Sequence, residues 1–175
     1  MEVSEATALI NGLHVNQKHP QVWVDLGCGT GIFSKALASK LPAGSSILCC
    51  DREQKIEPSF FISDVQLKFV QLDFEKEILD NLRLDGILMA NSLHYIRDQK
   101  LTLLKWRSLL NPDGLFVVIE YDTEEANPWI PFPVSFIRLK QLFHDAGIES
   151  VAKLGSRKSI FGNTSMYACE ALTSA

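Results

Sequence analysis

The stretch that decides the fold runs from Val22 to Ser34 and reads V-W-V-D-L-G-C-G-T-G-I-F-S. An apolar run typical of a buried strand carries one acid, Asp25, and leads into three glycines spaced two apart, after which a helical pattern begins at once. Glycine lets the backbone turn sharply there because it has no Cβ to block a positive φ or a ligand that lies close. The first amides of the following helix have no backbone partners and point to whatever fills the turn. The stretch therefore predicts a strand–turn–helix unit that binds a nucleotide-type ligand through its backbone.

The spacing of the glycines separates two kinds of cofactor. A dinucleotide fingerprint has the order G-x-G-x-x-G and places a pyrophosphate over the helix N-terminus. Here the third glycine comes one residue earlier, and an acid precedes the first glycine by two residues. The run resembles motif I of the class I S-adenosylmethionine-dependent methyltransferases, on residues Asp25, Gly27, Cys28, Gly29, Thr30 and Gly31. A glycine-rich turn without a ligand is the alternative.

The resemblance implies S-adenosylmethionine as cofactor and S-adenosylhomocysteine as product. The methionine tail of this cofactor is zwitterionic. Its carboxylate would use backbone N–H groups, and its ammonium would use a nearby carboxylate or carbonyl. The motif residues expected to bind the cofactor are Asp25, Gly27, Cys28, Gly29 and Gly31.

Length and composition fit one domain over residues 1–175. The net charge of −4, from 17 Lys and Arg against 21 Asp and Glu, disfavours a nucleic-acid partner, which requires a basic face. The chain begins without a basic n-region and contains no apolar run of membrane-spanning length, so we expect neither a secretory signal nor a membrane partner. The four cysteines form no C-x-x-C pair and no zinc spacing, which predicts no metal site and a reduced, cytoplasmic protein.

Strand and helix patterns alternate along the chain. The expected strands are 21–26, 46–51, 66–72, 85–90, 115–121, 148–154 and 166–172. The expected helices are 4–17, 32–41, 98–110 and 134–146, with a helical turn in 74–81, a turn at 111–114 and no decision for 53–64. This predicts an α/β three-layer sandwich with a seven-stranded, mostly parallel sheet and helices on both faces. The last two strands have no helix between them and should be antiparallel, and the resemblance implies that the final strand is inserted into the sheet. Within a single methyltransferase domain, residues 1–18 would form an N-terminal helix and 122–134 a substrate lid.

Ligands of open α/β sheets bind beyond the carboxyl ends of the strands, and polar residues stand at these ends. Asp51 ends the second strand, where a carboxylate can accept both ribose hydroxyls. The resemblance implies that Asp73 accepts a hydrogen bond from the adenine amino group and that Phe74 lies beside the ring. Asp73 is also suited to cap a helical turn. By the same resemblance, Asn91 and Ser92 flank the methionine portion.

The acceptor half of the site is less specific. The segment after the fourth strand lacks the Asn/Asp-Pro-Pro-Tyr sequence of enzymes that methylate base or amide nitrogens, which counts against adenine or glutamine as targets. Glu120, His94 and Tyr121 are the catalytic candidates, although the catalytic residue itself stays unknown. A histidine there could act as a base or merely pack against the next helix. Tyr95 lies near the expected transfer point and is a substrate candidate.

Three further substrate candidates come from later segments. Asn127 and Trp129 lie in the proline-rich stretch 122–134, which is either a lid over the strand ends or a packed connector. Arg157 lies in the expected loop 155–159, where it would pair with a substrate anion or be solvated.

The leading interpretation is a methyltransferase that acts on a small-molecule acceptor. The alternatives are a nucleic-acid or protein methyltransferase, a non-catalytic cofactor-binding module, and a nicotinamide-dependent oxidoreductase. The sequence leaves open the acceptor and its reacting atom, the need for a general base, the pathway and the oligomeric state.

Overall fold

One mixed sheet of eight strands forms the centre of the computed structural model, which describes residues 1–158 and 164–173. The strand order is β3-β4-β2-β1-β5-β6-β8-β7. Strands β4, β2, β1, β5 and β6 are parallel, whereas β3 pairs antiparallel with β4, and β8 pairs antiparallel with both β6 and β7. The strands are β1 Val22–Leu26, β2 Ser46–Asp51, β3 Ser59–Ile62, β4 Val65–Gln71, β5 Leu84–Ala90, β6 Leu110–Tyr121, β7 Ser150–Lys158 and β8 Ser165–Leu172. The mostly parallel sheet and the inserted last strand are confirmed.

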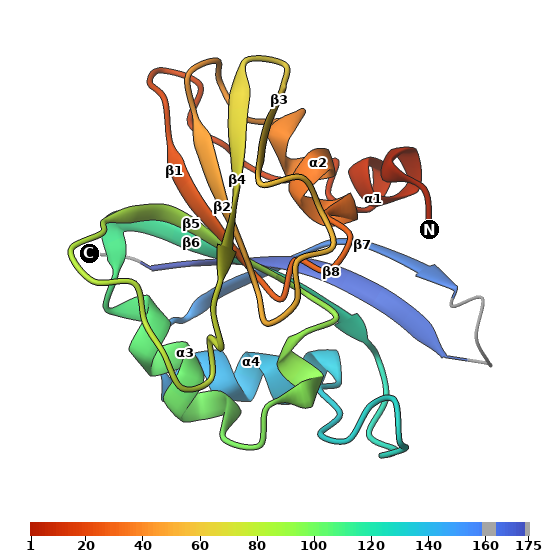
Figure 1. The fold of residues 1–175 in the computed structure, drawn as a ribbon. Helices are drawn as coiled ribbons and strands as arrows, with labels where there is room; N and C mark the ends of the chain where they lie inside the picture. Colours follow the sequence, from red (N-terminus) through yellow and green to blue (C-terminus); the bar gives the residue numbers. More distant parts are fainter. Residues whose placement is uncertain (159–163, 174–175) are drawn as a thin grey trace.

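Helices cover both faces of the sheet, as predicted. The helices are α1 Val3–Leu9, α2 Ile32–Ala38, α3 Gln99–Arg107 and α4 Phe136–Asp145, with a short 3₁₀ helix η1 at Leu93–Tyr95. Figure 1 shows α1 and α2 on one side of the sheet and α3 and α4 on the other. Each side has its own apolar core, one packed under α1 and α2 and one under α3 and α4. The fold is therefore the predicted three-layer α/β sandwich.

The first helix is shorter than predicted. It ends at Leu9, whereas the apolar spacing predicted a helix to about residue 17. The spacing continues because Leu13 is still buried, but Gly12 and the polar residues after it favour turns over helix. The chain thus reaches β1 through an irregular segment.

The predicted count of seven strands was one short. The additional strand, β3, lies in the segment 53–64 that the sequence left undecided. It forms a hairpin with β4 through Ser63 and Asp64, whose φ angles are 49° and 62°. Two positive φ values are typical of a type I′ turn, which fits the twist of paired strands. Asp tolerates this conformation, but no glycine marks the turn in the sequence.

The predicted turn at 111–114 is instead a bulge inside β6. Leu84 pairs with Leu110 and Gly86 with Leu115, so two steps on β5 match five on β6. The segment 74–81 contains turns at 74–76 and 80–81, and in the first of them the amides of Lys76 and Glu77 are bonded to the Asp73 carbonyl. No α-helix therefore follows β4 before the chain enters β5.

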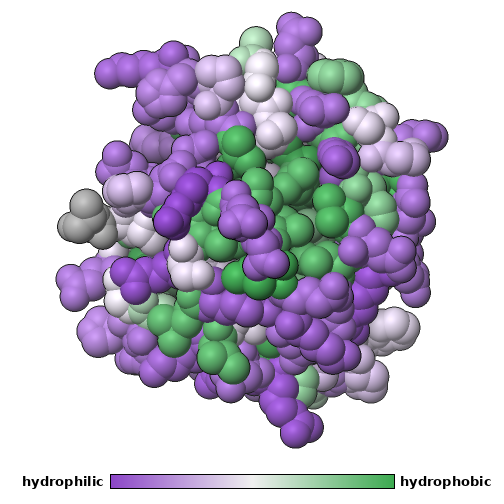
Figure 2. All heavy atoms as spheres, turned by 60° about the vertical axis from the view of Figure 1, so that its left-hand side comes forward, coloured by the Kyte–Doolittle hydropathy of each residue, from purple (hydrophilic) through white to green (hydrophobic). Residues whose placement is uncertain are grey.

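The layer of α3 and α4 does not extend over the whole sheet. In Figure 1 these two helices lie beneath β5, β6 and β8, while β1, β2 and β4 rise past them. Apolar residues on this side of β2 and β4, including Leu48 and Val70, are only partly buried. Figure 2, turned so that the left-hand side of Figure 1 faces the reader, shows a broad apolar area ringed by polar side chains. No helix in residues 1–158 or 164–173 is long and apolar enough to cross a membrane.

Candidate functional site

A cavity of about 490 Å³ opens at the carboxyl ends of the parallel strands. Its volume falls in the range of small-molecule and cofactor sites. The cavity brings together most of the residues that the sequence predicted for the site, namely Asp25, Gly27, Cys28, Gly29, Asp51, Phe74, Asn91, Ser92, Tyr95, Tyr121 and Arg157. Six predicted residues do not line it, namely Gly31, Asp73, His94, Glu120, Asn127 and Trp129.

The glycine turn after β1 has the backbone conformation that the sequence predicted. Gly27, Gly29 and Gly31 have φ values of 81°, 52° and 72°, which side chains disfavour. A Cβ on Gly27 would lie 2.6 Å from the Cβ of Ser92, so the turn and the segment after β5 approach too closely for a side chain. A Cβ on Gly29 would meet nothing within 4 Å, because this residue faces the cavity.

Most amides of the turn are already bonded within the protein. Of the five amides from Gly27 to Gly31, two donate to the Cys50 carbonyl at 2.8 and 3.0 Å, and one donates to Asp51 Oδ2 at 2.9 Å. The Gly31 amide donates to a carbonyl within the turn at 2.8 Å. The glycine amides themselves are therefore used within the protein. The amides that remain are those of Thr30 and of the first residues of α2.

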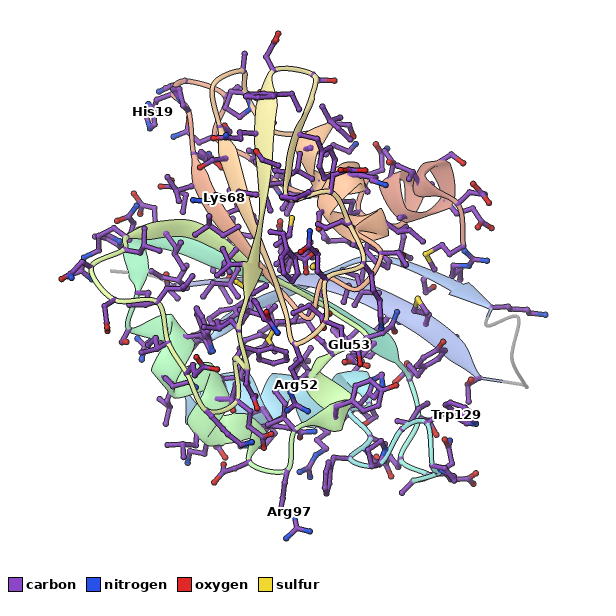
Figure 3. The ribbon with its side chains drawn as sticks, in the orientation of Figure 1. His19, Arg52, Glu53, Lys68, Arg97 and Trp129 are labelled. Atoms are coloured by element: carbon purple, nitrogen blue, oxygen red, sulfur yellow. The ribbon has the colours of Figure 1, made fainter. Side chains whose placement is uncertain are left out.

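Asp51 supports the turn and faces the cavity at the same time. One carboxylate oxygen accepts from the Gly29 amide, and the other accepts from the Glu53 amide at 3.1 Å. A carboxylate has about four lone-pair sites, so each oxygen can accept a further hydrogen bond. Asp51 lies at the end of β2, and Figure 3 labels the two residues that follow it, Arg52 and Glu53.

Asp25 is a buried carboxyl group at the floor of the cavity. It is 1% exposed, and its Oδ2 accepts a hydrogen bond of 2.5 Å from the Ser34 hydroxyl on α2. Burial raises the pKa of Asp25 to about 7, the Ser34 hydrogen bond lowers it, and the negative charge of Asp51 raises it further. The other oxygen, Oδ1, has no hydrogen-bond partner in the described part of the chain.

Two more buried polar atoms at the cavity lack partners within residues 1–158 and 164–173. They are Asn91 Oδ1 and Ser92 Oγ, in the segment that follows β5. Asn91 has a φ of 52°, a left-handed conformation that asparagine tolerates better than most residues. Buried polar atoms are normally hydrogen-bonded, so orphaned ones around one cavity indicate a place where a ligand supplies the missing partners.

Asp73 lies outside the cavity, with its carboxylate bonded to cations. Arg52 Nη2 lies 3.1 Å from Oδ1 and Lys76 Nζ lies 3.2 Å from Oδ2. Although partial burial opposes ionisation, these two cations hold the pKa of Asp73 below its usual value. Its carbonyl also closes the first turn after β4. Arg52, Phe74 and Glu75 line this end of the cavity instead.

His94 and Glu120 form a buried pair behind the cavity wall. His94 Nδ1 lies 2.5 Å from Glu120 Oε2, and both side chains are almost fully buried. The other oxygen of Glu120 accepts from the amides of Leu93 and His94 at 3.0 and 3.2 Å. The carboxylate thus fixes η1 to the end of β6, and it orients the imidazole.

Two tyrosines separate this pair from the cavity. The rings of His94 and Tyr95 lie 4.3 Å apart, and those of His94 and Tyr121 lie 6.2 Å apart. Burial raises the pKa of Tyr121 above its usual value, so its phenol stays protonated at neutral pH. Tyr121 can therefore donate or accept a hydrogen bond but does not act as a phenolate base.

The segment 122–134 does not bring its predicted residues to the cavity. Asn127 Oδ1 accepts from the amides of Trp129 and Ile130 at 2.9 and 3.0 Å, so it stabilises a local turn. Trp129 is 79% exposed, and Figure 3 shows it on the loop after β6, far from Arg52. The later part of the segment is fixed, because the Phe132 amide donates to the His94 carbonyl at 2.9 Å.

Arg157 lies in strand β7 and not in a loop as predicted. The strand continues to Lys158, and Ser159 lies outside the described residues. Arg157 Nη2 lies 3.1 Å from Glu5 Oε1 on α1. Its Nη1 is buried without a hydrogen-bond partner among the described residues, and the side chain lines the cavity.

Some residues of the cavity were missed by sequence reasoning. Ile32 and Phe33 follow the glycine turn directly, and Ala90 and Ile96 flank the segment after β5, so their positions next to motif residues could have revealed them. Arg52, next to Asp51, had the same signal. Glu75, next to Phe74, had it too, whereas Met1 and Met166 carried none, because only the tertiary fold brings them to the cavity.

The described residues contain no group of three His, Cys, Asp or Glu side chains arranged to hold a metal ion. All four cysteines are free thiols and buried. Burial of Cys169 raises the pKa of its thiol to about 12, so this thiol is not ionised at neutral pH.

The part of the chain that carries the glycine turn matches a known protein family. A family described as a methyltransferase domain matches residues 24–116, which are more than half of the chain. The chain belongs to the methyltransferase domain family. The match includes Asp25, the glycine turn, Asp51 and the segment after β5.

Curated relatives of this methyltransferase domain are distant. Uncharacterized methyltransferases of Mycobacterium tuberculosis and Mycobacterium bovis are 23% identical to it over 104 residues, which are 59% of the chain and 52% of each relative. The chain thus spans about half the length of the curated relatives that it matches.

Solved structures agree with the fold of the methyltransferase domain. The carbon methyltransferase of CurJ aligns with 99% of the chain and 55% of its own, at a TM-score of 0.71 and 17% identity. A 1,6-didemethyltoxoflavin-N1-methyltransferase of Burkholderia thailandensis aligns with 99% of the chain and 78% of its own, at a TM-score of 0.69 and 17% identity. It was crystallised with 1,6-didemethyltoxoflavin and S-adenosylhomocysteine. YcgJ of Bacillus subtilis aligns with 98% of the chain and 99% of its own, at a TM-score of 0.72 and 10% identity. At these identities the likeness concerns the fold.

Proposed function

We propose that this methyltransferase domain binds S-adenosylmethionine and transfers its methyl group to a small-molecule acceptor. The observation that carries the proposal is the set of unsatisfied polar atoms around one cavity: Asp25 Oδ1, Asn91 Oδ1 and Ser92 Oγ. They lie beside a glycine turn with three left-handed residues. Leaving such atoms buried and unpaired costs free energy, so a ligand that pairs with them gains affinity.

The polar groups fit the chemistry of this cofactor. Asp25 and Asn91 present oxygen acceptors that suit the ammonium of the methionine tail, and Asp51 has spare acceptor capacity for ribose hydroxyls. Phe74 offers an apolar ring at the far end, where the adenine would lie. The Thr30 amide and the start of α2 would take the carboxylate. Asp73 would contribute only by holding Arg52.

When bound, the cofactor supplies a methyl group on a sulfonium, which is electrophilic without further activation. The task of the chain is therefore to align the acceptor and to exclude water. The neutral phenol of Tyr121, the ring of Tyr95 and Met166 form the wall suited to that task.

His94 is the candidate base for an acceptor that must lose a proton. Glu120 holds Nδ1 of the imidazole, which favours a proton on Nδ1 and leaves Nε2 to accept another. Tyr95 and Tyr121 stand between this histidine and the cavity, so a direct transfer requires a rotation of Tyr95. The variants His94→Asn and Glu120→Gln should lower kcat at unchanged affinity for S-adenosylhomocysteine. Equal kcat values would remove the pair from the chemistry.

A small-molecule acceptor is favoured over a macromolecule. The net charge is −4, and the lining of the cavity includes Tyr121 and Arg157 beyond the predicted cofactor residues. One solved enzyme of this fold, the 1,6-didemethyltoxoflavin-N1-methyltransferase, holds 1,6-didemethyltoxoflavin together with S-adenosylhomocysteine. A nucleic acid would need a basic surface around the mouth.

Calorimetry tests the cofactor directly. S-adenosylmethionine and S-adenosylhomocysteine should bind the purified chain with 1:1 stoichiometry, and NAD and NADP should not bind. Binding of a nicotinamide dinucleotide alone would overturn the proposal in favour of an oxidoreductase.

A transfer assay then tests catalysis and acceptor class. The chain is incubated with methyl-labelled S-adenosylmethionine and a cell extract separated into small-molecule, RNA and protein fractions. Label should appear in the small-molecule fraction, and at S-adenosylmethionine concentrations below saturation less of it should appear with Asp51→Ala. Label confined to RNA or protein would overturn the acceptor class, and intact binding without label in any fraction would indicate a non-catalytic module.

A further inference from the structure

The strand order places the residues that line the cavity in sequence across the sheet. Asp51 stands on β2, Asp25 on β1, Ser92 after β5, Tyr121 on β6 and Arg157 on β7. From β1 to β7 the sheet takes four steps, through β5, β6 and β8. Neighbouring strands lie about 4.8 Å apart, so these two backbones are separated by roughly 19 Å. The carboxylates of Asp51 and Asp25 thus lie at one end of this row of residues, and the guanidinium of Arg157 lies at the other end.

Arg157 lines the cavity and retains unused hydrogen-bonding capacity. Glu5 is bonded to Nη2, while Nη1 is buried and has no partner in residues 1–158 and 164–173. A guanidinium stays protonated at any physiological pH and presents its donors in a planar fork. One edge of the fork is therefore fixed by α1, and the other edge can bind an anion.

The other side chains that line this end of the cavity are uncharged. Met1, Tyr95, Tyr121 and Met166 surround Arg157 with thioether and aromatic surface, and the phenol of Tyr121 is protonated. An anion that reaches Arg157 here meets a guanidinium among side chains of low polarity. Such surroundings strengthen a charge-assisted hydrogen bond.

We propose that Arg157 binds an oxyanion of the acceptor, a carboxylate or a phosphate, at the end remote from the methyl-accepting atom. The proposal rests on the proposed function, since it names the acceptor class of that same site. The tail of the cofactor is a less suitable anion, because Asp25, the acceptor for its ammonium, lies four strands away on β1. The acceptor is then a small organic acid, whose apolar body lies against Tyr121 and Met166.

Binding of simple anions to the cofactor-loaded protein tests this. Benzoate, phenyl phosphate and the uncharged benzamide are titrated into protein saturated with S-adenosylhomocysteine, and binding is followed by NMR. Benzoate or phenyl phosphate should bind, and benzamide should bind at least about 10-fold more weakly, the size of one charge-assisted hydrogen bond. Tighter binding of benzoate would indicate a carboxylate on the acceptor, and tighter binding of phenyl phosphate would indicate a phosphate.

Three variants make the test specific. Arg157→Gln should weaken the anion about 10-fold or more, and Arg157→Lys should retain part of the affinity, because it keeps the charge and loses the fork. Lys158→Gln is the matched control, because this lysine is the exposed neighbour on the same strand and does not line the cavity. All three should bind S-adenosylhomocysteine as the unchanged chain does and melt at a similar temperature.

Each other outcome overturns the proposal. Equal binding of benzoate, phenyl phosphate and benzamide, or unchanged anion binding by Arg157→Gln, would show that Arg157 does not select anions. A parallel loss of S-adenosylhomocysteine in Arg157→Gln would assign the residue to the cofactor. Failure of the unchanged chain to bind S-adenosylhomocysteine would instead refute the proposed function.

Discussion

Asp51 has two tasks in one side chain, and this makes it the most informative single residue of the cavity. It holds the glycine turn through the Gly29 amide, and it faces the place where a ribose would lie. A residue that only stabilised the turn would affect folding, whereas one that only bound ligand would not.

Asp51→Ala should weaken S-adenosylhomocysteine binding by about 1–3 kcal/mol, because charge-assisted hydrogen bonds to the sugar are lost. Calorimetry measures the dissociation constant. Glu53→Ala is the control, since its carboxylate is exposed and pairs with Lys55. An unchanged dissociation constant for Asp51→Ala would remove the residue from the cofactor site.

Asp25 makes the stability of the unliganded protein depend on pH. Its pKa is raised to about 7 in the fold, against 3.8 for the free group. Between these values the folded protein retains a proton that the unfolded chain has lost, so the free energy of unfolding falls as pH rises from about 4 to 7. The buried carboxylate is then unpaired unless a cationic group of a ligand reaches it.

Asp25→Asn should remove this contribution. Urea unfolding at pH 5 and pH 8 should show a smaller decrease in stability for the variant than for the unchanged chain, by a few kcal/mol. The same variant should bind S-adenosylhomocysteine more weakly at pH 8, because the partner of the ammonium is lost. Identical pH dependence of both proteins would show that Asp25 does not titrate in this range.

Strands β1 and β5 show packing at the scale of the element. Trp23 on β1 is fully buried, and its indole N–H donates to Gln21 Oε1 at 2.7 Å. Its ring lies over Gly86 on β5, where a Cβ would come within 2.3 Å of it. Glycine is required at that position because the neighbouring side chain occupies the space.

Gly86→Ala should therefore lower the free energy of unfolding by about 3 kcal/mol, at the upper end of the cost of overpacking a core. Denaturant unfolding measures the change. Gly12→Ala is the control, because a Cβ there meets atoms only at 3.7 Å, an ordinary contact distance. Equal stability of the two variants would contradict the packing argument.

The sequence predicted best the elements whose signal is local. The strand 46–51 is found at those residues, because its apolar run is bounded by turn residues. Helix α3 begins where Asp98 accepts the Leu101 amide at 3.0 Å, a cap visible in the sequence. Strand β3 was missed because an edge strand of four residues with a turn lacking glycine has almost no pattern.

The two halves of the site differ in the same way. Glycines and acids at strand ends predicted the cofactor half, and most of these predicted residues line the cavity. The acceptor half depends on which distant segments meet. Trp129, chosen for its aromatic surface, is exposed, whereas Arg157 reaches the cavity from a strand that was predicted as a loop.

The whole molecule depends on β8, which joins β6 to β7 along its full length. A chain ending at residue 158 should lose cooperative thermal unfolding, since β6 and β7 would both present unpaired edges. A chain ending at Thr173, which retains the bond from its amide to the Gly114 carbonyl, should melt as the full chain does. Circular dichroism measures both, and cooperative melting of the shorter chain would contradict the expectation.

The inserted strand also sets an order of assembly during synthesis on a ribosome. The turn after β1, Asp51 and the segment after β5 emerge early, and their strands are direct neighbours that can pair as they appear. The wall formed by Tyr121, Met166 and Arg157 must wait for the final strand to thread between two earlier ones. We therefore expect a nascent chain to form the proposed cofactor pocket before the proposed acceptor pocket. Until the final strand is inserted, the facing edges of β6 and β7 would be open to chaperones.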